Sequence, residues 1–131
     1  MNWSERLERV NAGIPEFWNL FCICIEQIAE SFAHSQFART DHLIAVPKRI
    51  KICVHIVRSK AGSTGLQHSI DLCLDKEGHR VFSRVEGEEL LSLKIGLDRD
   101  QSVCVLDEQG SPITNDKASE LFLRKFLYAA P

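Results

Sequence analysis

The spacing of apolar residues divides the chain into a helical first part, an extended middle and a helical end. Between residues 17 and 32 apolar side chains recur at steps of three and four, which is the period of a helix with one buried face. Pro15 suits the first turn of this helix, because the N–H that proline lacks would have no partner there. A separate short helix is predicted over Ser4–Val10, with Ser4 as its N-cap, and we expect Asn11–Gly13 to end it.

From residue 50 the apolar period falls to two, which is the spacing of a strand with one buried face. A strand entered after Pro47 is predicted, with its β-branched side chains turned to the helices and with Lys51 and His55 on the other face. A slip of one residue would bury polar groups and expose apolar ones, so we expect a firm register. The apolar side chains of this strand are Ile50, Ile52, Val54 and Ile56.

Turn signals predict two hairpins with the same turn chemistry. Alternating segments at 70–74 and 81–85 flank Asp75–Gly78, and the pattern Leu-Asp-x-x-Gly recurs at 106–110. Between the hairpins, residues 86–91 are expected to form one helical turn. Leu93, Ile95 and Leu97 then predict another strand, which Asp98–Gln101 turns back.

The helical period returns at the end of the chain, where Thr114 or Asn115 is expected to cap a helix that runs to about Ala129. One face of this helix is apolar, so it is expected to pack on the sheet beside the first helix. The predicted buried residues are Ala118, Phe122, Leu123, Phe126 and Leu127.

The order of these elements predicts an α+β fold. We expect two layers: an antiparallel meander sheet of five or six strands, and an N-terminal and a C-terminal helix packed on one of its faces. No linker or change of composition divides the chain, so one domain is expected over 1–131. In the order helix, three strands, short helix, two strands, helix, the chain resembles the dimeric secretion chaperones, although no sequence motif accompanies this likeness of element order.

Composition places the chain among soluble globular proteins. Of its 131 residues 44% are hydrophobic and 26% are charged. The longest apolar run, Leu20–Ile25, is far shorter than the ~20 residues of a membrane-spanning helix. The first residues also lack the basic and then apolar order of a signal peptide. We therefore expect a cytoplasmic protein that does not contact membranes.

The five cysteines are expected to be reduced and mostly buried. Their number is odd, and each lies inside an apolar segment, as buried thiols do. Cys22 and Cys24 are two residues apart, which points them about 200° from each other on a helix and prevents joint chelation. The sequence contains no CxxC pattern, so we expect neither a metal site nor a cofactor.

Charge is unevenly distributed, although the net charge is -2. This small net charge removes the general attraction to phosphate backbones, so nucleic acid is not the expected partner. Between His42 and Ile70, however, the chain contains no Asp or Glu. The basic strand in this segment could face acidic loops of the same chain, a partner, or a bound anion. The candidate anion-binding residues are Lys48, Arg49, Lys51, His55, Arg58 and Lys60.

The chain contains no pattern of nucleophile, base and orienting group, so no catalytic residue is expected. Cys53 and His55 share one strand face, but parallel side chains two residues apart stand roughly 6–7 Å from each other, beyond hydrogen-bond contact. An enzyme is the alternative, with a pocket between sheet and helices and groups from Cys53, His55, His79 or the loop carboxylates. These carboxylates are Asp71, Asp75, Glu77, Glu86, Glu88 and Glu89.

Self-association is the interaction that the apolar pattern favours. Apolar residues cover roughly 200° of the helix that follows Pro15, whereas a helix facing one core needs ~100°. A twofold homodimer would cover the surplus, and so could the last helix of the same chain. Large apolar side chains off the core stripes mark a candidate interface at Trp18, Ile23, Leu121 and Tyr128.

These observations favour a non-enzymatic, self-associating module that binds a protein partner or a small ligand. One alternative is the small enzyme described above. The other is a protein that binds nucleic acid or another polyanion through the basic segment 48–60. The sequence does not identify the ligand.

Overall fold

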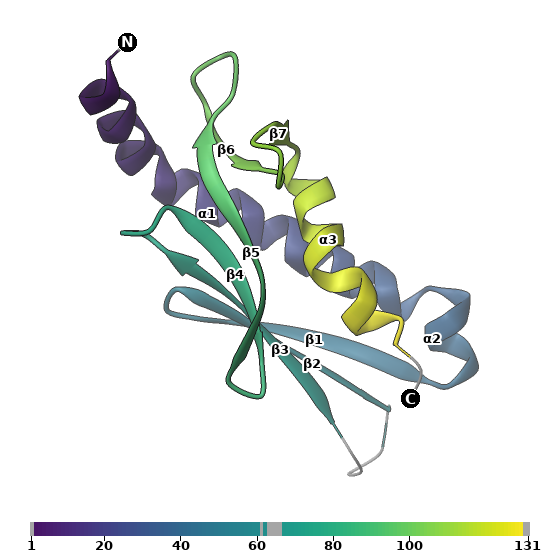
Figure 1. Ribbon diagram of the computed structural model, residues 1–131. Coiled ribbons are helices and arrows are strands. Elements are labelled where there is room, and N and C mark those ends of the chain that lie inside the picture. The colour runs from purple at the N-terminus through teal and green to yellow at the C-terminus, as the bar shows by residue number, and fades with distance from the viewer. Residues whose placement is uncertain (1, 61, 63–66, 130–131) are drawn as a thin grey trace.

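A seven-stranded antiparallel sheet curls into a half-barrel, and the helices cover one of its faces (Figure 1). The computed structural model describes residues 2–60, 62 and 67–129. The predicted α+β meander with terminal helices is confirmed, but the sheet has seven strands instead of five or six, in chain order. The elements are α1 (Trp3–Ala33), α2 (Gln36–Thr40), β1 (Leu43–Ile50), β2 (Cys53–Lys60), β3 (His68–Asp75), β4 (Arg80–Val85), β5 (Glu88–Leu97), β6 (Val103–Leu106), β7 (Pro112–Ile113) and α3 (Asn115–Leu127).

The first hairpin adds a strand and corrects part of the predicted register. A two-residue turn at 51–52 joins β1 to β2, so the predicted single strand is broken there. Val54 and Ile56 face the helices and are fully buried, as predicted. The prediction for Ile50 and Ile52 is wrong: both are largely exposed, because the turn interrupts the alternation between them and the rest of β2.

Helix α1 is a single helix of 31 residues, not the two predicted helices. Its N-cap is Asn2 instead of Ser4. Gly13 and Pro15 lie inside it, although they disfavour a helix interior by about 1 and 3 kcal/mol relative to alanine. Packing offsets this cost, because the buried stripe of α1 begins at Val10 and continues through both positions. Among the described residues, none of the helices combines the length and the apolarity needed to cross a bilayer.

The segment predicted as a helical turn at 86–91 is a tight hairpin turn followed by the start of β5. Glu86 and Gly87 both have positive φ, +52° and +80°, as a type I′ turn between twisted strands requires. Next to it β5 contains a bulge, in which Leu90 and Leu91 lie opposite Ser83 of β4, and the Ser83 hydroxyl accepts a hydrogen bond from the N–H of Leu91. Because no helix divides the strands, the element order differs from that of the dimeric secretion chaperones.

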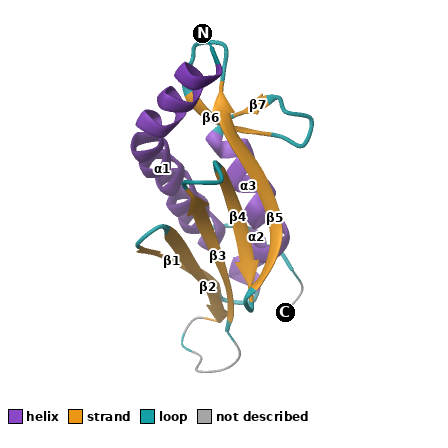
Figure 2. Cartoon of the chain, turned by 60° about the vertical axis from the view of Figure 1, so that its left-hand side comes forward, coloured by secondary structure: helices purple, strands orange, loops and turns teal. Residues whose placement is uncertain are grey.

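The apolar arc of α1 is covered on two sides by the chain itself. The sheet lies against one side and α3 lies alongside the other (Figure 2). The rings of Phe21 and Phe122 meet edge to face, with centroids 6.2 Å apart. The sheet and α3 of the same chain therefore account for most of the width of the arc. Cover by the last helix was the alternative to a dimer in the sequence analysis. The buried side chains of α1 are Val10, Ile14, Phe17, Phe21, Cys22, Ile25, Ala29 and Phe32.

Helix α3 begins and packs as predicted. Thr114 is its N-cap, and the hydroxyl oxygen accepts a hydrogen bond of 3.1 Å from the N–H of Lys117. Phe126, expected in the core, is partly buried. The other predicted core residues, Ala118, Phe122, Leu123 and Leu127, are buried.

The C-terminal end of α3 is held by Arg58 of β2, which is 3% exposed. Its Nη1 donates hydrogen bonds to the carbonyl oxygens of Leu127 (2.8 Å) and Ala129 (2.7 Å), with a longer one to Phe126 (3.4 Å). A cation at this end also offsets the negative pole of the helix dipole. Arg58, one of the candidate anion-binding residues, therefore binds main-chain carbonyl groups of the same chain and stabilises the fold.

Candidate functional site

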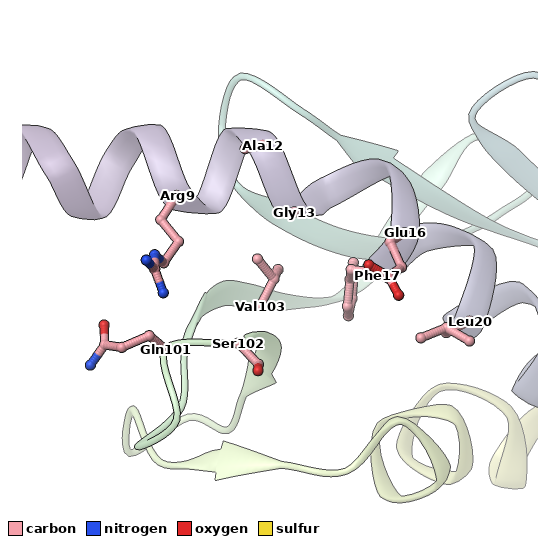
Figure 3. Close-up of a pocket in the computed structure, with 9 residues that line it drawn as sticks. All are labelled: Arg9, Ala12, Gly13, Glu16, Phe17, Leu20, Gln101, Ser102 and Val103. Atoms are coloured by element: carbon pink, nitrogen blue, oxygen red, sulfur yellow. The ribbon is translucent and has the colours of Figure 1, made fainter.

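A groove with polar and apolar walls lies between the N-terminal half of α1 and the turn that joins β5 to β6 (Figure 3). We call it the α1/β6 groove; its volume is about 450 Å³. Arg9 and Gln101 approach one end of it from opposite walls, and Phe17 and Leu20 lie toward the other end. The lining residues are Arg9, Ala12, Gly13, Glu16, Phe17 and Leu20 of α1, together with Gln101, Ser102 and Val103.

Gly13 sets the distance between the two walls of this groove. A Cβ atom at this position would lie 2.4 Å from Cγ2 of Val103, which is closer than real side chains approach. Val103 is β-branched and stiff at χ1, so it cannot turn aside cheaply. A glycine that weakens the helix therefore lets α1 lie directly against β6.

The turn that carries Gln101 has the same construction as the turn of the next hairpin. At 98–102 and at 107–111 an aspartate carboxylate accepts hydrogen bonds of 2.8–3.0 Å from the N–H groups two and four residues later. The main chain closes both turns with equivalent hydrogen bonds. The fourth residue is left-handed in both, with φ of +62° at Gln101 and +82° at Gly110. Glycine adopts this conformation freely, whereas a residue with a side chain is destabilised there by about 1 kcal/mol.

The side chain of Gln101 also carries an unpaired polar atom. Its Oε1 is buried and has no hydrogen-bond partner, and no other buried side-chain nitrogen or oxygen in the described residues lacks one. Buried polar atoms in folded proteins are nearly always paired, and an unpaired one costs about 1–3 kcal/mol. The guanidinium of Arg9 lies across the groove (Figure 3). The unpaired Oε1 of Gln101 and the guanidinium of Arg9 thus lie at the same end of the groove.

Two of the predicted anion-binding residues are engaged inside the chain. Arg49 extends from β1 to α1, where its guanidinium binds the carboxylate of Glu26 and donates a hydrogen bond of 2.9 Å to Oδ1 of Asn19. The hydrogen bond to Glu26 raises the pKa of Arg49. Arg58 is buried against the end of α3. Neither guanidinium faces the solvent side of the basic strand.

Of the other four basic residues, Lys48 and His55 are direct cross-strand partners on β1 and β2, while Lys51 and Lys60 lie before and at the far end of β2. His55 lies on the outer face of the sheet, where its Nδ1 is 2.6 Å from Oδ1 of Asp71. Arg84 also approaches this carboxylate, at 3.6 Å. The three lysines are exposed: Lys48 on β1, Lys51 in the following turn and Lys60 at the far end of β2. The six residues are therefore not assembled into one surface.

The four predicted interface residues also occupy separate surroundings. Trp18 is half-buried and stacks on Phe21, with ring centroids 5.8 Å apart. Ile23, Leu121 and Tyr128 are exposed. Leu121 and Tyr128 line two different cavities beside α3, of about 630 Å³ and 600 Å³.

The outer face of β2 and β3 brings the enzyme candidates Cys53 and His55 close to further polar groups. Asp71 orients His55, which is the third group that the sequence pattern lacked. The Sγ of Cys53, however, contacts the Sγ of Cys73 at 2.7 Å. Among the described residues no group of three or more His, Cys, Asp and Glu side chains is placed to hold a metal ion.

The remaining enzyme candidates that make contacts belong to polar interactions at the surface. The Nε2 of His79 lies 2.7 Å from Oδ1 of Asn11 on α1. Arg80 binds the carboxylates of Asp75 and Glu89. The pKa of Asp75 is lowered by the backbone N–H of Gly78 first and by Arg80 second. His79, Asp75 and Glu89 therefore each have a polar partner within the chain.

Comparison with protein-family models, with curated proteins and with solved structures found no match to this chain. The site therefore rests on its geometry. Reasoning from the sequence missed Gln101, although a signal is present: Asp-x-x-Gln-Ser at 98–102 parallels Asp-x-x-Gly-Ser at 107–111. Aligning the two turns shows that glutamine occupies a position where the turn prefers glycine.

Proposed function

We propose that this chain is a binding module that takes a short peptide segment of a partner protein in the α1/β6 groove. Gln101 carries the proposal. Of two turns built alike, the one beside the groove keeps a side chain at the left-handed position, and that side chain holds a buried acceptor without a partner. Strain and unsatisfied polar groups concentrate at functional sites, where a ligand relieves them.

The chemistry of the groove matches a peptide group. A peptide N–H can donate to Oε1 of Gln101, while the adjacent carbonyl oxygen accepts a hydrogen bond from the guanidinium of Arg9. Val103, two residues after Gln101, forms an apolar part of the wall and suits an aliphatic side chain next to that peptide group. A ligand with both features satisfies the orphan acceptor and buries apolar surface in one step.

The spacing of the two charged side chains of the groove indicates how much peptide would lie between them. Arg9 and Glu16 are seven residues apart on α1, which is about 10 Å along the helix axis. An extended peptide covers that distance with about three residues. Glu16 then lies near the end of the segment opposite Arg9, where its carboxylate suits a basic group of the ligand.

Titration with N-acetyl-leucinamide, which contains two amide groups and one aliphatic side chain, tests this function. We expect the backbone NMR signals of 101–103 to shift and to saturate with a dissociation constant of about 1 mM, as suits so small a ligand. In Gln101→Gly these shifts are expected to vanish. The free energy of unfolding of the same variant should be about 1 kcal/mol higher, because glycine adopts the left-handed conformation without strain.

Gly110→Gln in the equivalent turn is the matched control. It introduces the same strain away from the groove, so it should lower stability by about 1 kcal/mol and leave the titration unchanged. Absence of shifts in the unmodified protein, or binding that survives in Gln101→Gly, would refute the peptide site.

A row of exposed apolar side chains on the edge strand β1 favours self-association as a second function. Ile44, Val46 and Ile50 point outward from β1, and Ile52 follows in the turn; the most exposed of them is Val46, at 53%. Exposed apolar side chains gathered on one edge strand mark an interaction surface, here with Lys48 between Val46 and Ile50 on the same face. Pro47 interrupts the free main-chain edge, so a second copy would pack against these side chains instead of extending the sheet.

Sedimentation at about 100 μM separates this interface from the one predicted on α1. If two copies meet at β1, Val46→Glu should be monomeric while Ile23→Glu remains dimeric, because glutamate in an apolar contact would be desolvated without a partner. The opposite pattern would place the interface on α1. A monomeric unmodified protein at this concentration would exclude both.

A further inference from the structure

Two cysteines face each other on the neighbouring strands β2 and β3, close to the β1–β2 turn. Cys53 of β2 and Cys73 of β3 are direct partners in the antiparallel register, and both point to the outer face, away from the helices. Their Sγ atoms are 2.7 Å apart, although both are free thiols. The other three cysteines lie on α1 and β6.

The register places these cysteines at a position that suits a disulfide. The N–H of Leu74 donates to the carbonyl oxygen of Ile52 at 2.9 Å, so Cys53 and Cys73 form a non-hydrogen-bonded pair. In such pairs the Cα atoms are about 4.5 Å apart and the side chains come closer than in hydrogen-bonded pairs. Disulfides span Cα distances of about 4.4–6.8 Å. A bond between the two sulfur atoms therefore requires little movement of the sheet.

The two thiols differ in their access to solvent. Cys53 is half-buried, while Cys73 is 2% exposed. Burial raises the pKa of Cys73 to about 12, and the contact with Cys53 adds to this shift. A reagent from solution consequently reaches Cys53 first, and Cys73 acts from within the sheet.

We propose that Cys53 and Cys73 form a dithiol site that low-molecular-weight disulfides, such as glutathione disulfide, oxidise to an intramolecular disulfide. Cys53, as the thiolate, attacks one sulfur of the reagent, which forms a mixed disulfide and releases one reagent thiolate. Cys73 then gives up its proton and attacks the Sγ of Cys53, which releases the second reagent thiolate. The chain loses two protons and two electrons, and the reagent takes up both to become two thiols.

The contact between the sulfur atoms is what makes the second step efficient. A thiol with a high pKa is rarely ionised, but it has no distance to cover before it reacts. The mixed disulfide is therefore expected to be short-lived in the unmodified chain. Without Cys73 it has no internal partner and should accumulate.

Treatment of the folded protein with glutathione disulfide, followed by denaturation and mass spectrometry, tests the site. The unmodified chain is expected to lose two of its five thiols and the mass of two hydrogen atoms. Digestion should yield one cross-linked pair of peptides that joins Cys53 to Cys73. The variant Cys73→Ser should instead keep a glutathione adduct on Cys53.

Cys104→Ser is the matched control, since it removes a buried cysteine on β6 and should form the same cross-link as the unmodified chain. Five free thiols after treatment would overturn the proposal. So would a lasting adduct on Cys53 in the unmodified chain, or a cross-link through Cys22, Cys24 or Cys104. The three results that would overturn the proposal are read in the unmodified protein, so they do not depend on whether a variant folds.

Discussion

Arg58→Met is expected to lower the free energy of unfolding by about 3 kcal/mol. Methionine keeps the apolar stem of the side chain but removes the donor that holds the carbonyl oxygens of Leu127 and Ala129. These acceptors would lose a charged partner at a partly buried helix end, where water replaces it incompletely. Urea denaturation followed by circular dichroism measures the difference.

Lys60→Met tests whether the loss of stability in Arg58→Met results from the buried position of Arg58 or from the removal of a positive charge on β2. Lys60 is on the same strand but exposed, so its replacement is expected to change stability by no more than about 0.5 kcal/mol. Equal effects of the two substitutions would contradict a structural role for Arg58. Arg58→Lys should fall between them, because one ammonium cannot reproduce the spread of the guanidinium donors.

Phe21→Ala is expected to remove about 3–5 kcal/mol of stability. The ring is fully buried and contacts the rings of Phe17, Trp18 and Phe122, all with centroids within 6.2 Å. Truncation would leave a cavity where α1, α3 and the sheet meet. Because domains of this size have a total stability of about 5–15 kcal/mol, much of the variant could unfold near physiological temperature. Thermal denaturation gives the shift in Tm.

Leu20→Ala provides the comparison for the same helix. Leu20 is adjacent in sequence but 47% exposed, so we expect a loss below about 1 kcal/mol. Similar losses for both variants would contradict the packing of Phe21 as the cause of the larger loss, because alanine is a better helix former than leucine or phenylalanine and neither substitution weakens the helix itself.

Local sequence patterns predicted the parts of the fold whose structure is determined by residues within one helix or turn. The buried stripe of α1 around Phe21, the Asp75–Gly78 turn and the Thr114 cap of α3 depend on residues close together in the chain. The β1–β2 turn could not be found this way, because Lys51 and Ile52 are neither glycine nor proline and continue the alternation of their neighbours. The continuity of α1 was also hidden, since packing against β6 decides it.

The sites depended still more on long-range pairing. The unpaired oxygen of Gln101 becomes evident only when α1 lies over the turn, and the Cys53–Cys73 contact requires the register of β2 and β3. Arg58 is different, because its burial could have been predicted from the sequence. It has the same strand parity as Val54 and Ile56, so alternation alone places it on the buried side.

The cover that α3 gives to α1 has a consequence for protein synthesis. A ribosome releases Phe21 long before Phe122, and the roughly 100 residues between them take on the order of 5–20 s to translate. Throughout that time α3 does not cover the aromatic side of α1, even if the strands of the sheet have already paired. The nascent chain is therefore most vulnerable to aggregation before its last helix emerges, and cellular chaperones have a defined interval in which to protect it.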